Sequence, residues 1–169
     1  MLMFIPFLTE SGKSPADIFL VFRTLLNCLK CIIYEDRYNR VADIWLKNNL
    51  KAHDFIPEQY WTSNYELVKE MMSQAEVYVY EDDKMIQGFV GLSNEYIEGI
   101  FVSDEMQSCG IGKLLLDYIK NKKVRLRLNV YQKNARALSF YQREGFDIQY
   151  EGLDDATGEK EYIMLWQQK

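Results

Sequence analysis

Residues 96–131 predict a strand, a glycine-containing turn, a helix and a second strand in direct succession, and this order constrains the fold most. YIEGIFVS (96–103) alternates as a strand does, QSCGIG (107–112) follows a short turn, and an apolar helical pattern extends to residue 122. RLRLNVY (125–131) alternates again. A strand, a helix and another strand form the crossover unit of α/β domains, so this segment predicts such a domain.

The two glycines of QSCGIG stand where the helix begins. Glycine inside a helix costs about 0.8–1.0 kcal/mol relative to alanine, but at a helix start it lets backbone N–H groups approach an anion. The backbone amides of residues 108–113 are therefore expected to bind a phosphate or pyrophosphate. A P-loop is excluded because Leu114 follows Lys113 where Ser or Thr is required, and the dinucleotide fingerprint is excluded because Leu115 replaces its third glycine.

Patterns on both sides of this segment predict a mixed α/β domain. The expected elements are a strand at 31–37, helices at 37–53 and from 57 to about 72, strands at 76–82 and 85–93, a helix at 134–145, and a terminal hairpin of 146–152 with 159–167. The order is strand, two helices, three strands, helix, strand, helix, two strands. A meander thus precedes two crossover units.

Residues 1–30 differ from the rest and are expected to form an N-terminal extension with an amphipathic helix. Ser14 can cap the helix, Pro15 suits its first position, and apolar residues then recur at helical spacing in SPADIFLVFRTLLNCLK. Three alternatives stay open: the helix packs on the domain, contacts a second subunit in a homodimer, or belongs to an extension that the domain does not need. The predicted domain is 31–169.

Composition argues against several classes of protein. The net charge of -5 and the pI near 5.0 disfavour a nucleic-acid-binding surface, which needs clustered lysine and arginine. The single histidine and three cysteines lack the spacing of metal ligands, so no metal is expected and a reducing, cytoplasmic location is favoured. No apolar run is long enough for a membrane span, so no membrane partner is expected.

A second motif lies in LNVYQKNARALSFYQREGF, where Asn134 and Tyr141 are two turns apart on one helix face. Q-x-x-G-x-G, then LNV, then N-x-x-A-x-x-F-Y-x-x-x-G-F resembles the GNAT superfamily of acyl-CoA N-acetyltransferases, and among them the small bacterial protein acetyltransferases. The resemblance includes the strand order and covers about residues 31–169, but not 1–30.

The resemblance implies the GNAT fold, a mixed sheet whose fourth and fifth strands splay apart to admit acetyl-CoA. The fourth strand is YIEGIFV, and the backbone of Ile100 and Val102 is expected to bind the pantetheine arm. Asn134 is expected to bind the same arm. The implied pyrophosphate site comprises Ser108, Cys109, Gly110, Ile111, Gly112 and Lys113, of which Cys109 occupies a variable position of the motif.

The implied activity is direct transfer of an acetyl group from acetyl-CoA to a primary amine in a ternary complex. Tyr141 is expected near the thioester sulfur, where it can protonate the leaving thiolate. Many relatives that acetylate protein amines have a glutamate where Asn129 stands, and asparagine cannot take a proton. Glu98, expected on the same strand face as Ile100 and Val102 by alternation, could be the base directly or through water, or it could be an exposed strand charge with no catalytic role. A further alternative is that the amine arrives neutral and needs no base.

The resemblance suggests that AHDFIPEQYW (52–61) lines the acceptor site, with His53, Phe55 and Trp61 as candidate substrate-binding residues. A purely structural role for His53 is the alternative. The acceptor is expected to be a lysine side chain, a protein N-terminus or a small amine, and the acidic chain favours a cation. A function from another class, a non-catalytic acyl-CoA-binding regulatory protein, stays open because Asn129 replaces an acid.

Overall fold

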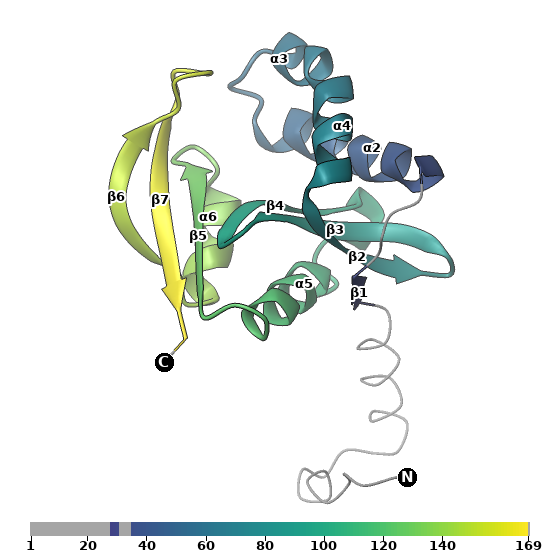
Figure 1. Cartoon of the computed structure of the whole chain (residues 1–169). Helices are drawn as coiled ribbons and strands as arrows, with labels where there is room; N and C mark the ends of the chain where they lie inside the picture. The colour runs from purple at the N-terminus through teal and green to yellow at the C-terminus, as the bar shows by residue number, and fades with distance from the viewer. Residues whose placement is uncertain (1–27, 31–34, 169) are drawn as a thin grey trace, which may run out of the picture.

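The computed structural model describes residues 28–30 and 35–168, and seven strands in them form one mixed sheet (Figure 1). The strands follow the order β1-β2-β3-β4-β5-β7-β6 across the sheet. They are β1 (Cys28–Lys30), β2 (Glu76–Asp82), β3 (Met85–Ser93), β4 (Tyr96–Val102), β5 (Arg125–Tyr131), β6 (Asp147–Leu153) and β7 (Lys160–Gln167). The helices are α2 (Glu35–Ala52), α3 (Glu58–Ser63), α4 (Tyr65–Gln74), the 3₁₀ turn η1 (Asp104–Met106), α5 (Ile111–Lys120) and α6 (Ala135–Arg143).

Strands β4 and β5 are parallel and pair at one position, Tyr96 with Arg127. The Arg127 backbone N–H also donates to the Glu95 carbonyl at 2.9 Å. Beyond this point the two strands separate, whereas β5 pairs with β7 along its whole length, from Arg125 to Tyr131. The predicted mixed sheet with diverging fourth and fifth strands is therefore confirmed.

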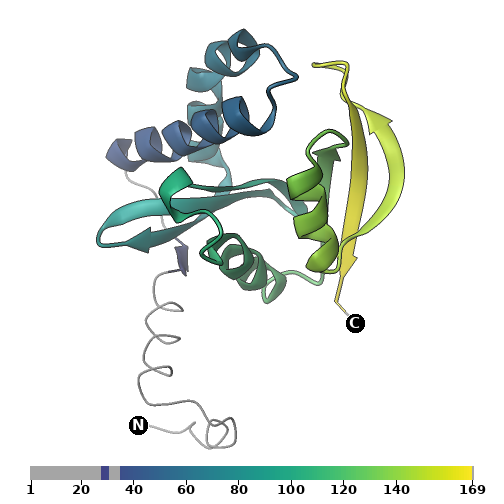
Figure 2. The same ribbon diagram turned by 180° about the vertical axis from the view of Figure 1, so that it is seen from behind.

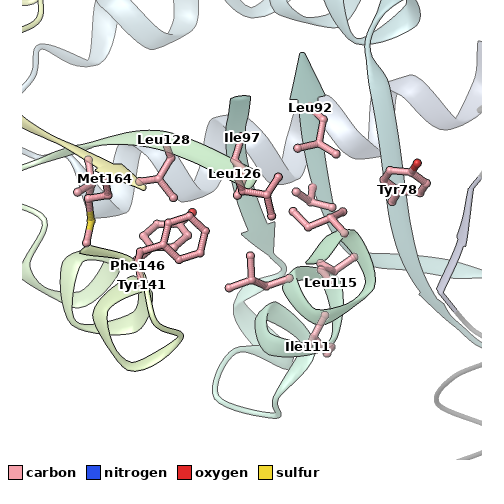
Figure 3. Packing of buried hydrophobic residues seen from close by; sticks show 14 of the residues in the cluster. Tyr78, Leu92, Ile97, Ile111, Leu115, Leu126, Leu128, Tyr141, Phe146 and Met164 are labelled. Carbon is pink, nitrogen blue, oxygen red and sulfur yellow. The ribbon is translucent and has the colours of Figure 1, made fainter. Parts of the chain in front are cut away.

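Helices cover both faces of the sheet, as the two opposite views show (Figures 1 and 2). On one face α5 buries Ile111, Leu115, Leu116 and Ile119, each at most 2% exposed, against residues of β3, β4 and β5. Figure 3 shows part of this core, which extends to Tyr141 of α6. On the other face α2, α3 and α4 form a second core with β2 and β3. The sheet thus separates two apolar layers.

The first strand lies earlier in the chain than its sequence pattern indicated. Residues 28–30 form β1, which pairs antiparallel with β2, so the predicted N-terminal helix does not extend through them. Residues 35–37, predicted as part of that strand, begin α2. The remainder of both predictions, residues 1–27 and 31–34, lies outside the described residues, and the domain boundary at residue 30 stays a prediction.

The helix predicted from residue 57 to about 72 is two helices, divided at Asn64. Asn64 has φ −91° and ψ 0°, and its side-chain amide donates to the Tyr60 carbonyl at 2.7 Å. Asparagine competes in this way with the helix backbone, which explains why the apolar periodicity continues although the helix does not. Within residues 28–30 and 35–168, no helix has the length and apolarity needed to cross a membrane.

Candidate active site

The turn between β4 and α5 has two residues in the left-handed region. Ser108 has φ 63° and Gly110, which precedes the first residue of α5, has φ 86°. A Cβ built on Gly110 would have no atom within 4 Å, so this backbone faces open space. The first N–H groups of a helix have no partner within the helix. The turn therefore has the backbone conformation and the free space that a phosphate group requires.

The side chains of Lys113 and Cys109 in the same turn make hydrogen bonds to the protein itself. Lys113 donates to Glu144 at 2.9 Å and to Asp117 at 3.2 Å, and these hydrogen bonds raise its pKa. Its ammonium group is thus engaged with α5 and α6. The Cys109 thiol is exposed and contacts the Gln107 carbonyl at 3.6 Å. What the turn offers to a phosphate is mainly its backbone.

The edge of β4 that faces the opening includes the backbone groups of Ile100 and Val102. The Ser103 N–H donates to the Gln87 carbonyl of β3 at 2.7 Å, so the groups of Val102, and of Ile100 by alternation, point away from β3. The Val102 carbonyl accepts from the side chain of Asn48 at 3.0 Å. The backbone groups of Ile100 are thus free to bind a ligand, whereas the Val102 carbonyl is already bound by Asn48. The sequence did not indicate this role of Asn48.

Gln107, the first residue of QSCGIG, connects the end of β4 with α6. Its amide nitrogen lies 3.3 Å from the Val102 carbonyl and 3.2 Å from the Asn48 side chain. Its amide oxygen accepts from Arg136 of α6 at 2.8 Å. Gln107 therefore links the turn to α2 through Asn48 and to α6 through Arg136.

The structure brings Asn134 and His53 together, although 81 positions separate them. Asn134 caps α6, because its side-chain oxygen accepts from the Ala137 N–H at 3.1 Å. Its amide nitrogen therefore faces His53 Nε2, 3.0 Å away. The predicted cofactor-binding residue and the predicted acceptor-binding residue are direct neighbours.

His53, Phe55 and Trp61 belong to one aromatic cluster. The His53 ring stacks on Trp61 with centroids 5.3 Å apart, and Phe55 lies 5.7 Å away. Tyr131, the last residue of β5, closes the cluster at 5.2 Å from His53. Burial lowers the pKa of His53 to about 4, so the imidazole is neutral at pH 7. Within the described residues, His53 Nδ1 and Trp61 Nε1 are buried without a hydrogen-bond partner.

Tyr141 lies on the other side of the sheet, in the α5–α6 core. Its ring is 7% exposed and packs edge-on against Phe140, with ring centroids 5.2 Å apart, and against Phe146 at 5.5 Å. Figure 3 shows Tyr141 beside Phe146. Its hydroxyl makes no hydrogen bond within the described residues. Burial, and to a lesser degree Tyr96, raise the pKa of Tyr141 above its ordinary value, so the phenol is protonated at neutral pH.

Glu98 lies on a different strand face from the one expected. In the β3–β4 ladder Gly91 pairs with Gly99 and Leu92 pairs with Ile97, which leaves Glu98 as the extra residue of a β-bulge. Ile100 and Val102 consequently pack on the α5 face, and the expectation that Glu98 shares their face is wrong. Alternation fails here because the bulge shifts the pattern by one residue.

Glu98 instead lines a cavity of about 800 Å³ between α4 and strands β2–β4, together with Phe101. Its carboxylate makes no hydrogen bond or ion pair within the described residues. Burial raises its pKa above the ordinary value. Glu98 is thus a free carboxylate on the α2–α4 side of the opening, across the sheet from Tyr141. Its catalytic role stays a prediction.

Asn129 donates its side-chain amide to Glu161 Oε1 of β7 at 2.5 Å. Burial raises the pKa of Glu161, although the hydrogen bond from Asn129 acts in the opposite direction. The sequence gives no sign of this partnership, because the two residues are 32 positions apart on strands that are not consecutive. A second carboxylate thus lies at the position where Asn129 lacks one.

A sheet that opens between two parallel strands, with an anion-binding helix start at one end, defines an acyl-CoA-dependent N-acyltransferase. A family model described as an acetyltransferase (GNAT) domain matches residues 73–148. The peptidyl-lysine N-acetyltransferase YiaC of Escherichia coli is 34% identical over 128 residues, which cover 75% of this chain and 88% of YiaC. The chain belongs to the GNAT acetyltransferase family.

Other relatives and solved structures agree with this assignment. Peptidyl-lysine N-acetyltransferase YjaB of Escherichia coli is 29% identical over 124 residues, or 72% of this chain and 83% of YjaB. The solution structure of apo YjaB superposes with a TM-score of 0.72 over 81% of this chain and 95% of that one, at 22% identity. The Thermoplasma acidophilum PaiA N-acetyltransferase, solved with coenzyme A, gives 0.69 over 83% and 97%, at 18% identity. These likenesses confirm the fold.

The chain is therefore an N-acetyltransferase that transfers the acetyl group of acetyl-CoA to a primary amine. No finding from the comparisons supports the alternative of a non-catalytic regulatory protein. The free backbone at Gly110 and the available edge of β4 at Ile100 are features that fit acetyl-CoA. The roles of individual residues in the site stay predictions.

Proposed function

We propose that the acceptor is a lysine side chain of a protein or peptide. The observation that supports this acceptor most directly is the 34% identity to YiaC, a peptidyl-lysine N-acetyltransferase. The site adds chemical support, because an ammonium group approaching the opening meets the carboxylates of Glu98 and Glu161. A long, unbranched lysine stem suits an approach between the aromatic cluster and the sheet.

For acetyl-CoA, the proposed pyrophosphate site is the backbone of residues 108–113, aided by the α5 dipole. The backbone of Ile100 and the side-chain amide of Asn134 border the opening and are proposed to bind the pantetheine arm. His53, Phe55 and Trp61 are proposed to form the wall against which the acceptor lies. The hydrogen bond between Asn134 and His53 would then place the two substrates on adjacent surfaces.

In the proposed mechanism the protein moves one proton on each side of the sheet. Bound acetyl-CoA supplies a thioester, whose acetyl group is transferred to the amine and whose sulfur departs as the thiol of CoA. On the α2–α4 side, Glu98 accepts a proton from the ammonium group, so that an N–H bond breaks and a carboxyl O–H bond forms. The amine nitrogen then bonds to the acetyl carbon and releases a second proton to solvent as the amide forms. On the α5–α6 side, as the bond between that carbon and the sulfur breaks, the Tyr141 hydroxyl gives its proton to the sulfur and is later reprotonated from solvent. Backbone N–H groups of β4 stabilise negative charge at the carbonyl oxygen.

Steady-state release of the CoA thiol with a set of matched acceptors tests the proposed acceptor. The set contains a peptide with one lysine and a blocked N-terminus, the same peptide with norleucine for lysine and a free N-terminus, and a small diamine. We expect the blocked lysine peptide to give the highest kcat/KM. Higher kcat/KM for the free N-terminus or the diamine would contradict the lysine assignment and leave the acetyltransferase activity in place.

A cytoplasmic location and a homodimer stay predictions.

A further inference from the structure

The opening between β4 and β5 begins directly after the pair of Tyr96 and Arg127. Both strands run in the same direction, so Glu98 and Asn129, each two positions further along its strand, lie on either side of the start of the opening. Arg127 lies over the Tyr96 ring at 5.9 Å, and Asn129 follows on the same face of β5. The bulge turns Glu98 to the α2–α4 face as well. Two polar side chains thus border the acceptor side of the opening.

Asn129 holds the carboxylate of Glu161 at this border. Its amide nitrogen lies 2.5 Å from Glu161 Oε1, and Glu161 pairs with Tyr131, the next residue of β5 on this face. The second carboxylate oxygen of Glu161 has no hydrogen-bond donor within the described residues. The pair therefore extends one acid toward the opening from the β5 side, as Glu98 does from the β4 side.

Tyr96 connects these groups in space. Its hydroxyl lies close enough to the Asn129 backbone, to Glu98 and to Glu161 for each of them to affect its pKa. It also interacts with Tyr141 from the opposite side of the sheet. A phenol that interacts with all three groups places Glu161 at the same opening as the proposed acid and base.

We propose that Glu161, oriented by Asn129 across the opening from Glu98, binds the ammonium group of the acceptor and selects for a cationic primary amine. The inference rests on the proposed lysine acceptor. Lysine with a reference pKa near 10.4 carries a full charge at pH 7, and a partly buried carboxylate attracts it more strongly than an exposed one. Asn129 is the positioning residue, because its amide fixes the carboxylate but does not contact the acceptor.

Glu161 and Glu98 differ in whether a side chain donates a hydrogen bond to them, and this difference suits them to different tasks. Asn129 donates to Glu161, which favours the charged form, whereas no side chain donates to Glu98 within the described residues. The charged groups that face Glu161 from the β6–β7 turn, Asp154 and Asp155, are also acidic and add to its attraction for a cation. Burial and the two aspartates still raise the pKa of Glu161, so the two acids differ in their hydrogen-bond donor and not in the direction of their shift. A carboxylate oriented by a donor suits binding, and one without a donor suits proton transfer.

The test compares two acceptors and two variants. The acceptors are a lysine peptide and the same peptide with an aminooxy side chain, a nucleophile that is neutral at pH 7. Glu161→Gln removes the charge and keeps an oxygen that can accept from Asn129. Glu151→Gln is the matched control, because Glu151 is an exposed residue of the same hairpin that pairs with Tyr162, away from the Asn129 face.

For Glu161→Gln we expect KM for the lysine peptide to rise about tenfold or more, which corresponds to the loss of one well-placed charge interaction. We expect kcat for the lysine peptide, KM for acetyl-CoA and both constants for the aminooxy peptide to stay within about threefold. Glu151→Gln should change none of them. Glu161→Asp, which keeps the charge but shortens the reach, should give an intermediate KM.

Equal losses with both acceptors would overturn the proposal, because they would show a structural role for Glu161. An unchanged KM for the lysine peptide would overturn it too. A failure of the lysine assignment itself would be seen with the unaltered chain alone. The Glu161 comparison is then made with whichever cationic primary amine that chain acetylates, against its neutral aminooxy analogue, so the two proposals fail separately.

Discussion

The side-chain amide of Asn134 donates to Nε2 of His53 over 3.0 Å, and this contact determines which nitrogen of the neutral imidazole carries the proton. The Asn134 oxygen is committed to the Ala137 N–H, so the amide nitrogen is the group that faces His53. Nε2 must then accept, and the proton of the neutral ring lies on Nδ1, which has no partner within the described residues. The only histidine of the chain is therefore held neutral between the two proposed substrate sites.

The first prediction concerns the titration of His53. Its pKa of about 4 in the folded protein lies below the reference value near 6.5, so the unfolded chain binds the extra proton between these values. The stabilisation from the neutral ring, up to about 3 kcal/mol, is fully present above pH 6.5 and is lost as the pH falls toward 4. Because the chain has one histidine, its ring signal in a proton NMR titration reports this pKa directly.

A matched variant checks the same point through stability. His53→Gln should remove most of the loss in unfolding free energy between pH 7 and pH 5, although the variant also loses the ring stacking on Trp61 at every pH. The comparison is thus between pH slopes and not between absolute stabilities. An NMR midpoint near 6.5, or equal slopes for both proteins, would contradict the neutral-histidine assignment.

The second prediction separates the two tasks of Asn134. Asn134→Ala should lower the unfolding free energy by about 1 kcal/mol, because α6 loses its N-cap, and should also weaken acetyl-CoA binding. Asn134→Ser keeps a capping oxygen, so its stability should return close to that of the unaltered chain. Both variants lack the amide nitrogen, so both should bind acetyl-CoA more weakly in calorimetry. Full affinity in Asn134→Ser would show that the cap is the sole task of Asn134.

The parts of the fold that the sequence predicted are those with a local signal. Strand alternation and helical spacing located β2 to β7 and α5 and α6, and the glycine at residue 110 marked the start of α5. The opening between β4 and β5 was predicted only through the resemblance, because no local pattern records that a parallel ladder ends after one pair.

The features that the sequence did not predict depend on which strands become neighbours. The face of Glu98 changed because Gly91 pairs with Gly99 and forces a bulge, which is a property of the ladder and not of β4 alone. Glu161 reaches Asn129 because β7 lies between β5 and β6 in the sheet. In both cases the sequence shows the residue type, but it does not show the strand register that determines which residues the side chain contacts.

The third prediction tests the turn at Gly110. Gly110→Ala should weaken acetyl-CoA binding at least about tenfold, because its Cβ would point into the open space proposed for the pyrophosphate and the left-handed backbone would be strained. Gly158→Ala is a matched control, since Gly158 has φ 72° and equally open surroundings but lies in the β6–β7 turn. Both variants should lose similar stability in thermal unfolding, and only the first should lose affinity. Equal affinities would remove the phosphate assignment.

The last prediction concerns Tyr141 and the chemical step. Tyr141→Phe removes a hydroxyl that has no hydrogen-bond partner within the described residues and keeps the ring between Phe140 and Phe146, so stability should change little. If the hydroxyl protonates the sulfur, kcat should fall about 10²–10⁴-fold while acetyl-CoA affinity stays the same.

Steady-state kinetics with the best acceptor, combined with calorimetry of acetyl-CoA binding, measures both quantities for Tyr141→Phe. Tyr118→Phe is the control, because Tyr118 lies on α5 against Tyr78 of β2, at the end of the sheet away from the opening. That control should keep full turnover. A joint, modest fall of kcat and affinity in Tyr141→Phe would indicate that the hydroxyl orients the thioester. Full activity would exclude Tyr141 as the acid, and the proton would then come from water.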